Sequence, residues 1–124
     1  NVGFHSGQND LKKNKKIMRL SKNIVFGITC HNSLSLARKA ILLDSTYIAF
    51  GAFFPTKTKK VKYVADKNIL KKAKNLNTKI VAIGGITNKN YKVLLKDGAD
   101  FIAISSFVWK NKEFNPLEAI KLFK

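Results

Sequence analysis

The stretch Thr46-Tyr-Ile-Ala-Phe-Gly51, followed by Ala52-Phe-Phe-Pro-Thr-Lys-Thr-Lys-Lys60, sets the pattern for the whole chain. The first part is a short apolar run, which predicts a buried β-strand. The second part is a loop rich in threonine and lysine that begins where this strand ends. In α/β proteins, loops at the carboxyl ends of strands bind phosphorylated ligands. Two hydroxyls and an ammonium in such a loop therefore predict a phosphate or diphosphate site.

The same order of a short apolar run and then an amphipathic segment repeats along the chain. The five predicted strands are Val2 to His5, Ile24 to Thr29, Tyr47 to Gly51, Ile80 to Gly84 and Phe101 to Ser105. Each is nearly continuous in apolar residues, which indicates strands covered on both faces. Repeated strand-then-helix units predict a parallel sheet with right-handed crossovers. Periodicity alone leaves two folds open, a doubly wound sheet and part of an eight-stranded barrel.

Residues that start or stop helices lie between the predicted strands. Ser33, Asp66 and Thr87 each predict a helix start, and Gly98 predicts the end of the third helix. Asn115-Pro-Leu-Glu118 combines an N-cap, an N1 proline and an N3 glutamate before the final helix. The lysine-dense stretch Leu11 to Leu20 predicts one further helix. The expected inward-facing residues of the capped helices are Leu36, Ala37, Ala40, Ile41, Ile69, Leu70, Ala73, Leu76, Tyr91, Leu94 and Leu95.

Length and composition indicate one modest domain over residues 1–124. The chain is 45% hydrophobic, enough for a core, and it contains no apolar run of about eighteen residues that would cross a membrane. It starts at Asn1 without a methionine or a secretory signal, so we expect a chain cut from something longer. The single cysteine, Cys30, cannot form an internal disulfide and indicates a cytoplasmic protein.

A formal charge of +17 would attract nucleic acids and other polyanions. However, the lysines are spread over nearly every predicted helix, and the chain is also rich in Asn, Ile and Phe. An AT-rich coding sequence produces this combination, and no recognisable nucleic-acid motif accompanies the charge. We therefore do not expect a nucleic-acid partner, although the charge favours small anionic ligands.

Five motifs occur in an order that resembles the thiamine phosphate synthase family. They are His5-Ser-Gly-Gln-Asn-Asp10, Phe26-Gly-Ile-Thr-Cys-His31, Phe50-Gly-Ala-Phe-Phe-Pro-Thr-Lys-Thr-Lys59, Val81-Ala-Ile-Gly-Gly-Ile86 and Gly98-Ala-Asp-Phe-Ile-Ala-Ile-Ser105. The resemblance covers essentially the whole chain and implies a (β/α)8 TIM barrel. The five strand-helix units would be the fourth to eighth of that barrel. The N-terminal units, with the family's pyrimidine-diphosphate motif and Asn-Asp metal pair, would then lie before Asn1.

The resemblance implies a transferase of thiamine biosynthesis. Such an enzyme condenses hydroxymethylpyrimidine diphosphate with hydroxyethylthiazole phosphate, and Mg2+ assists. In the family, diphosphate leaves first and the thiazole nitrogen then attacks a pyrimidine cation. This chemistry depends on stabilising the charge of the leaving group and on positioning two ligands. The sequence leaves open whether this segment alone is active, and whether it is a monomer or a homo-oligomer.

By this resemblance, Thr56, Lys57 and Thr58 contact the thiazole phosphate, and Lys59 contacts the diphosphate as a catalytic group. Pro55 presets the backbone just before these residues. The structural alternative is an exposed polar loop, which is common in a lysine-rich protein.

Thr29 is the second expected catalytic residue, because the family commonly has a serine there and a hydroxyl at this position could donate to diphosphate. The alternative is a strand-end hydroxyl bonded to nearby backbone. Asp10 follows the first strand and would be a Mg2+ ligand if the diphosphate supplies further oxygens. Its alternative role is to cap the helix that follows.

Gly84 and Gly85 end the fourth predicted strand, and Ile104 and Ser105 end the fifth. A predicted helix start follows each pair, so their backbone amides could bind a phosphate without a basic side chain. The alternative role of the glycines is a tight turn. His5, Gln8, His31 and Cys30 carry no predicted catalytic role, and His5, His31 and Cys30 are expected to be structural.

Several positions depart from the family pattern. Ala52 replaces a usual proline, Ser6 an aliphatic residue and Thr46 an acid, and a glycine is missing near Ala65 and Asp66. A related thiazole tautomerase has a histidine at the position of Ala52, which counts against that activity. A non-catalytic phosphate-binding module and a basic nucleic-acid binder are the competing functions outside this enzyme class.

Overall fold

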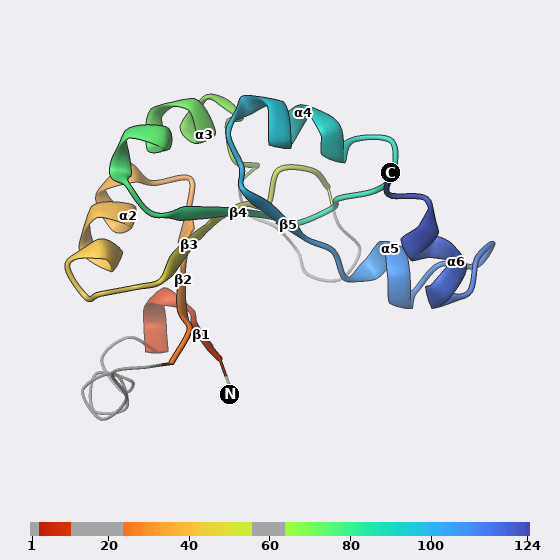
Figure 1. Cartoon of the computed structure of the whole chain (residues 1–124), viewed down its shortest axis with the longest axis horizontal. Helices are drawn as coiled ribbons and strands as arrows, with labels where there is room; N and C mark the ends of the chain where they lie inside the picture. The colour runs from red at the N-terminus through yellow and green to blue at the C-terminus, as the bar shows by residue number, and fades with distance from the viewer. Residues whose placement is uncertain (1–2, 11–23, 56–63) are drawn as a thin grey trace.

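Five parallel strands form a single curved sheet in the computed structural model, which describes residues 3–10, 24–55 and 64–124 (Figure 1). The strands lie in the order of the sequence, and every neighbouring pair is parallel. Their bounds are β1 Phe4–Ser6, β2 Phe26–His31, β3 Tyr47–Phe50, β4 Lys79–Ile83 and β5 Phe101–Ala103. All five predicted strands are therefore confirmed within two residues at each end. The predicted parallel sheet is also confirmed.

The helices α2, α3 and α4 lie along the convex side of the sheet (Figure 1). Their bounds are α2 Leu34–Ile41, α3 Asn68–Ala73 and α4 Tyr91–Asp97, and the 3-10 segment η2 Lys74–Leu76 extends α3. Two further helices, α5 Ser106–Trp109 and α6 Pro116–Lys121, lie side by side near the C-terminus. A short 3-10 turn, η1 Gln8–Asp10, follows β1. The predicted helix over Leu11 to Leu20 lies outside the described residues.

Two of the four predicted helix starts have the expected cap. The Ser33 hydroxyl accepts a hydrogen bond from the Leu36 amide at the start of α2. Asn115 and Glu118 form a complete capping box at α6, with Pro116 in the first turn. Gly98 ends α4 at φ 122°, and its N–H donates to the carbonyls of Leu94 and Leu95. These signals are local in sequence, so the sequence alone was enough to find them.

The other two starts are shifted. α3 begins at Asn68 with Lys67 in the cap position, although the Asp66 carboxylate still accepts from the Asn68 amide at 2.9 Å. α4 begins at Tyr91 and not near Thr87, because residues 87–90 form a turn in which Asn90 Oδ1 accepts from the Thr87 amide. Leu95, predicted to face inward, is 39% exposed, so this prediction is wrong, whereas Tyr91 and Leu94 of the same helix are buried as predicted.

The strand register separates the residues of the sheet into two faces. On the helix-covered face, Ile28, Ile48 and Ile80 are at most 2% exposed and pack with Leu70 of α3 and Leu94 of α4. The other face carries His5, Thr29, Tyr47, Val81 and Phe101 at the alternate positions. Phe101 is 57% exposed there. In the described part of the chain the helices pack on one face, so the prediction that both faces are covered is wrong at Phe101, whereas Ala49 on the same face is 1% exposed.

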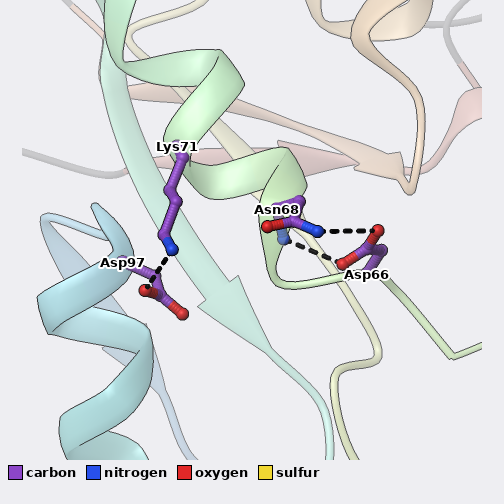
Figure 2. A network of polar contacts seen from close by, with 4 residues as sticks. All are labelled: Asp66, Asn68, Lys71 and Asp97. Atoms are coloured by element: carbon purple, nitrogen blue, oxygen red, sulfur yellow. Dashed lines mark hydrogen bonds and ion pairs between the residues drawn. The ribbon is translucent and has the colours of Figure 1, made fainter.

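Polar contacts link α3 to its neighbours on the covered face of the sheet (Figure 2). Lys71 of α3 forms an ion pair with Asp97 of α4 at 3.4 Å. The Asp66 amide donates to Asn32 Oδ1, which links the start of α3 to the loop after β2. These contacts join α3 to α4 and to the loop after β2. None of the helices in the described ranges is both long and apolar enough to cross a lipid bilayer.

Candidate functional site

The carboxyl ends of the strands meet at one edge of the sheet, because all five strands are parallel. Thr29 lies near the end of β2, Gly84 and Gly85 follow β4, and Ile104 and Ser105 follow β5. The sheet thus brings these predicted residues to the same edge. The predicted ligands Thr56, Lys57, Thr58 and Lys59 lie outside the described residues.

The loop after β3 runs beside the end of β4. Its Phe53 amide donates to the Ile83 carbonyl and its Phe54 amide to the Gly84 carbonyl, both at 3.2 Å. A Cβ added at Gly85 would lie 2.5 Å from the carbonyl oxygens of Phe54 and Pro55. Only glycine allows this close approach of two backbones. The two glycines therefore place the described end of the loop, Pro55, against the end of β4.

Gly84 and Gly85 form a tight turn, at φ 90° and 66°. Asn90 Nδ2 donates to the Gly85 carbonyl at 3.1 Å and fixes this turn. The predicted helix start directly after the glycines is wrong, because α4 begins only at Tyr91. The amides here belong to a glycine turn and not to a helix N-terminus.

Ser105 does precede a helix, as predicted. It occupies the N-cap position of the four-residue helix α5, and its carbonyl accepts from the Trp109 amide at 2.9 Å. Its side chain makes no capping hydrogen bond and is exposed. Ile104 beside it is half-buried. The Ser105 hydroxyl is therefore not used by the helix that follows it.

Thr29 belongs to a chain of polar contacts across three strands. Its Oγ1 lies 2.8 Å from His5 Nε2, and His5 Nδ1 lies 2.9 Å from the Tyr47 hydroxyl. Gln8 Nε2 donates to the Thr29 carbonyl at 2.5 Å. The expected alternative, a hydroxyl bonded to backbone, is therefore replaced by a bond to an imidazole. His5 is a hydrogen-bonded, structural residue, as predicted.

Tyr47 and Gly27 were not among the predicted site residues. His5, Gly27 and Tyr47 stand side by side on β1, β2 and β3. A Cβ at Gly27 would lie 1.9 Å from Tyr47 Cζ, so the tyrosine ring lies directly over this glycine. The signal was present in the sequence as a glycine inside a strand, which marks close approach by another group. The partner could not be named without the strand register.

Burial shifts the pKa of one group on each of β1, β2 and β3. Partial burial lowers the pKa of His5, so the imidazole is neutral at neutral pH. Burial raises the pKa of Tyr47, so its hydroxyl keeps its proton. Burial also raises the pKa of the Cys30 thiol to about 12, and Cys30 is fully buried. This confirms the prediction that Cys30 is a packing residue, because the reactive thiolate is disfavoured.

Asp10 is the last residue of η1 and is exposed. The described ranges contain no group of three or more His, Cys, Asp or Glu side chains that could hold a metal ion. A Mg2+ ion needs only one or two protein carboxylates when phosphates and waters supply the other oxygens. In this loop Asp10 offers a single, exposed carboxylate.

Two of the departures from the family pattern have a structural account. The Thr46 hydroxyl accepts from the Phe26 amide at 2.9 Å and so joins β2 to the start of β3. The Ala52 side chain lies against Gly84, where an added Cβ would be only 2.2 Å away.

His31 is exposed at φ 51°, and its carbonyl accepts from the Gly51 amide. This contact is consistent with the structural role predicted for His31.

Comparison with known proteins gives a consistent result. Residues 2–108 match the family described as thiamine monophosphate synthase. A thiamine-phosphate synthase of Pelagibacter ubique is 51% identical over 98% of this chain and 59% of its own length. A solved thiamine phosphate pyrophosphorylase from Pyrococcus furiosus has a TM-score of 0.81 and 27% identity, over 98% of this chain and 56% of that one. The chain thus spans somewhat more than half the length of these relatives.

Proposed function

The chain belongs to the thiamine monophosphate synthase family, and on this premise we propose that it forms the phosphate-binding part of a thiamine phosphate synthase. The enzyme would join hydroxymethylpyrimidine diphosphate to hydroxyethylthiazole phosphate and release diphosphate. Both substrates are phosphorylated small molecules, which suits the charge of +17. We also propose a cytoplasmic location, since the lone cysteine is buried as a free thiol.

The five strand-helix units would be the fourth to eighth of a (β/α)8 barrel. Two observations support this. The strands lie in the sheet in the same order as in the sequence. A barrel requires this order, whereas the strand order of a doubly wound sheet reverses at one point. The exposed sheet face, with Phe101 at 57%, is the face that would turn toward the barrel interior.

The observation that best supports a phosphate site is the contact between the loop after β3 and Gly84-Gly85. Each of these glycines would clash with that loop if it had a side chain. The described loop ends at Pro55, and the next residues in the sequence are Thr56 to Lys59. Backbone amides of a glycine turn attract anions, as do threonine hydroxyls and a lysine ammonium. The neighbouring strand end adds Ile104 and Ser105 to this edge.

We propose the following roles for the residues of this chain. Thr56, Lys57, Thr58 and the Gly84-Gly85 turn would hold the thiazole phosphate, together with Ile104 and Ser105. Lys59 and Thr29 would stabilise the departing diphosphate, whose negative charge grows as the bond breaks. Asp10 would hold Mg2+, which supplies further positive charge to the diphosphate when it is bound.

Replacing Lys59 by Ala in the natural protein that carries this chain tests the proposal. We expect turnover to fall about 100-fold or more, because one preorganised charge is lost from the leaving-group site. Lys72→Ala, at an exposed position of α3, is the matched control and should leave the rate unchanged. Equal rates for wild type and Lys59→Ala would refute the role of Lys59.

A binding titration separates this function from a general affinity for polyanions. Hydroxyethylthiazole phosphate and single-stranded DNA would each be titrated into the protein at rising salt. We expect saturable binding of the phosphate and weak binding of DNA that disappears at high salt. Tight DNA binding without any response to the thiazole phosphate would instead indicate a nucleic-acid binder.

A further inference from the structure

We propose that Tyr47, seated over Gly27, holds the His5 imidazole in the tautomer with its proton on Nε2, which leaves the hydroxyl hydrogen of Thr29 free to donate to an oxyanion. His5 and Tyr47 are then positioning residues, which act through Thr29. The identity of the oxyanion as a diphosphate rests on the proposed function. The tautomer of His5 does not depend on the proposed function.

The contacts allow two arrangements of the hydrogens. His5 Nδ1 lies 2.9 Å from the Tyr47 hydroxyl, and His5 Nε2 lies 2.8 Å from Thr29 Oγ1. A neutral imidazole carries one N–H and one bare nitrogen, whereas each hydroxyl can donate or accept. In the first arrangement, the Tyr47 hydroxyl donates to His5 Nδ1, and His5 Nε2–H donates to Thr29 Oγ1. In the second, His5 Nδ1–H donates to the Tyr47 hydroxyl, and the Thr29 hydroxyl donates to His5 Nε2.

The chemistry of the two hydroxyls favours the first arrangement. A phenol, with a pKa of about 10, is a much stronger acid than an aliphatic alcohol, so it is the better donor and the poorer acceptor. Burial of Tyr47 keeps its proton in place. With the tyrosine donating to Nδ1, the single imidazole proton lies on Nε2 and is donated to Thr29.

This arrangement matters for Thr29 because its hydroxyl has one hydrogen. If Thr29 donated to Nε2, that hydrogen would be used inside the protein. With Nε2–H as the donor, Thr29 Oγ1 accepts, and its hydrogen can point to a ligand. Gln8 holds the Thr29 carbonyl at the same time, so the backbone of the residue is also fixed.

Gly27 makes the arrangement sterically feasible. β2 lies between β1 and β3, so Tyr47 must reach across β2 to meet His5. The ring does this by lying on Gly27, where an added Cβ would be 1.9 Å from Tyr47 Cζ. The two rings are also stacked, with centroids 5.6 Å apart and an interplanar angle of 22°. The hydrogen bond and the stacking therefore depend on the same glycine.

Long-range 1H–15N NMR spectra of the full chain at neutral pH test the tautomer directly. The chain has two histidines, so a His31→Gln variant assigns the His5 signals. We expect a bare Nδ1 and a protonated Nε2 in the wild type. A proton on Nδ1, or an equal mixture of both tautomers, would overturn the proposal.

Three variants extend this test. Tyr47→Phe keeps the ring but removes the donor, and it should give a mixture of tautomers. Gly27→Ala should give the same mixture by displacing the ring. Tyr91→Phe removes another tyrosine hydroxyl, which bonds to Lys124, and should leave the His5 spectrum unchanged. A His5 tautomer that is unaffected by Tyr47→Phe would contradict the role of Tyr47.

The functional consequence is measured in the natural protein that carries this chain, with inorganic diphosphate and Mg2+ as the probe. We expect Tyr47→Phe to weaken diphosphate binding about 3- to 10-fold, the effect of one misdirected hydrogen bond. In a Thr29→Val background the same change should have no further effect, since it acts through Thr29. An undiminished loss in that background would overturn the positioning role. A wild-type natural protein that binds no diphosphate would refute the proposed function, while the NMR spectra of the chain would still decide the tautomer.

Discussion

The two faces of the sheet are built from alternate residues of the same five strands, yet they are organised by different forces. On the covered face, Ile28, Ile48 and Ile80 are almost fully buried against the helices. On the opposite face, His5, Thr29 and Tyr47 meet through hydrogen bonds, and Phe101 is largely exposed. One face therefore supplies stability through packing, while the other fixes the positions of polar atoms.

The first prediction contrasts packing on the two faces and should have the largest effect. Ile48→Ala removes a fully buried side chain from the covered face and should cost about 2–5 kcal/mol of unfolding free energy. Phe101→Ala removes an exposed side chain from the other face and should cost less than about 1 kcal/mol. Urea denaturation of the full chain measures both. Equal losses would show that the two faces do not differ in packing.

The second prediction changes the packing of the Tyr47 ring on the polar face without removing any polar group. Gly27→Ala forces a methyl into the Tyr47 ring and should cost about 1–3 kcal/mol, with a change in the near-UV circular dichroism of tyrosine. Gly7→Ala is the matched control, because its added Cβ would meet only Asp10 Oδ2 at an ordinary 3.5 Å. A Gly27→Ala variant as stable as Gly7→Ala would mean that the ring does not lie where the structure places it.

The third prediction concerns the beginning of the strands, away from both faces, and its effect should be the smallest. The Asp100 carboxylate accepts from the Ile80 amide at 2.8 Å and pairs with Lys79 at 3.1 Å. The amide hydrogen bond, followed by Lys79, lowers the pKa of Asp100. Because the folded-state pKa lies below the unfolded value of about 3.9, this stabilisation is complete above that pH and is lost as pH falls through the folded-state pKa.

Asp100→Asn tests this contribution. At neutral pH we expect a loss of about 1 kcal/mol or less, since the group is partly screened by solvent. Between about pH 4 and pH 2 the difference between wild type and variant should shrink. Acid titration followed by urea melts measures it, and a difference that stays constant over this range would contradict the assignment.

Much of the fold could be predicted from the sequence because its signals are local. Apolar runs gave all five strands, and Ser33, Gly98 and the Asn115–Glu118 capping box marked helix ends correctly. The start of α4 was placed too early because Thr87 looks like a cap, whereas Asn90 folds residues 87–90 into a turn. A side chain three residues away decides this geometry, and both residue types suit a helix start.

The candidate site was less predictable, because it depends on which residues become neighbours across strands. Thr29, Gly84, Gly85 and Ser105 were found from motifs, and the parallel sheet places them at one edge. The contact of Tyr47 with His5 joins residues 42 positions apart in the sequence. It follows only from the register that sets His5, Gly27 and Tyr47 side by side.

Amide NMR spectra of the natural protein that carries this chain, recorded during titration with inorganic diphosphate and Mg2+, test whether an anion site lies at the strand ends. We predict that the largest shift changes occur at Thr29, Gly84, Gly85 and Ser105, and that the amides of α2, α3 and α4 change little. Changes spread over the lysine-rich helices, with none at the strand ends, would contradict the account.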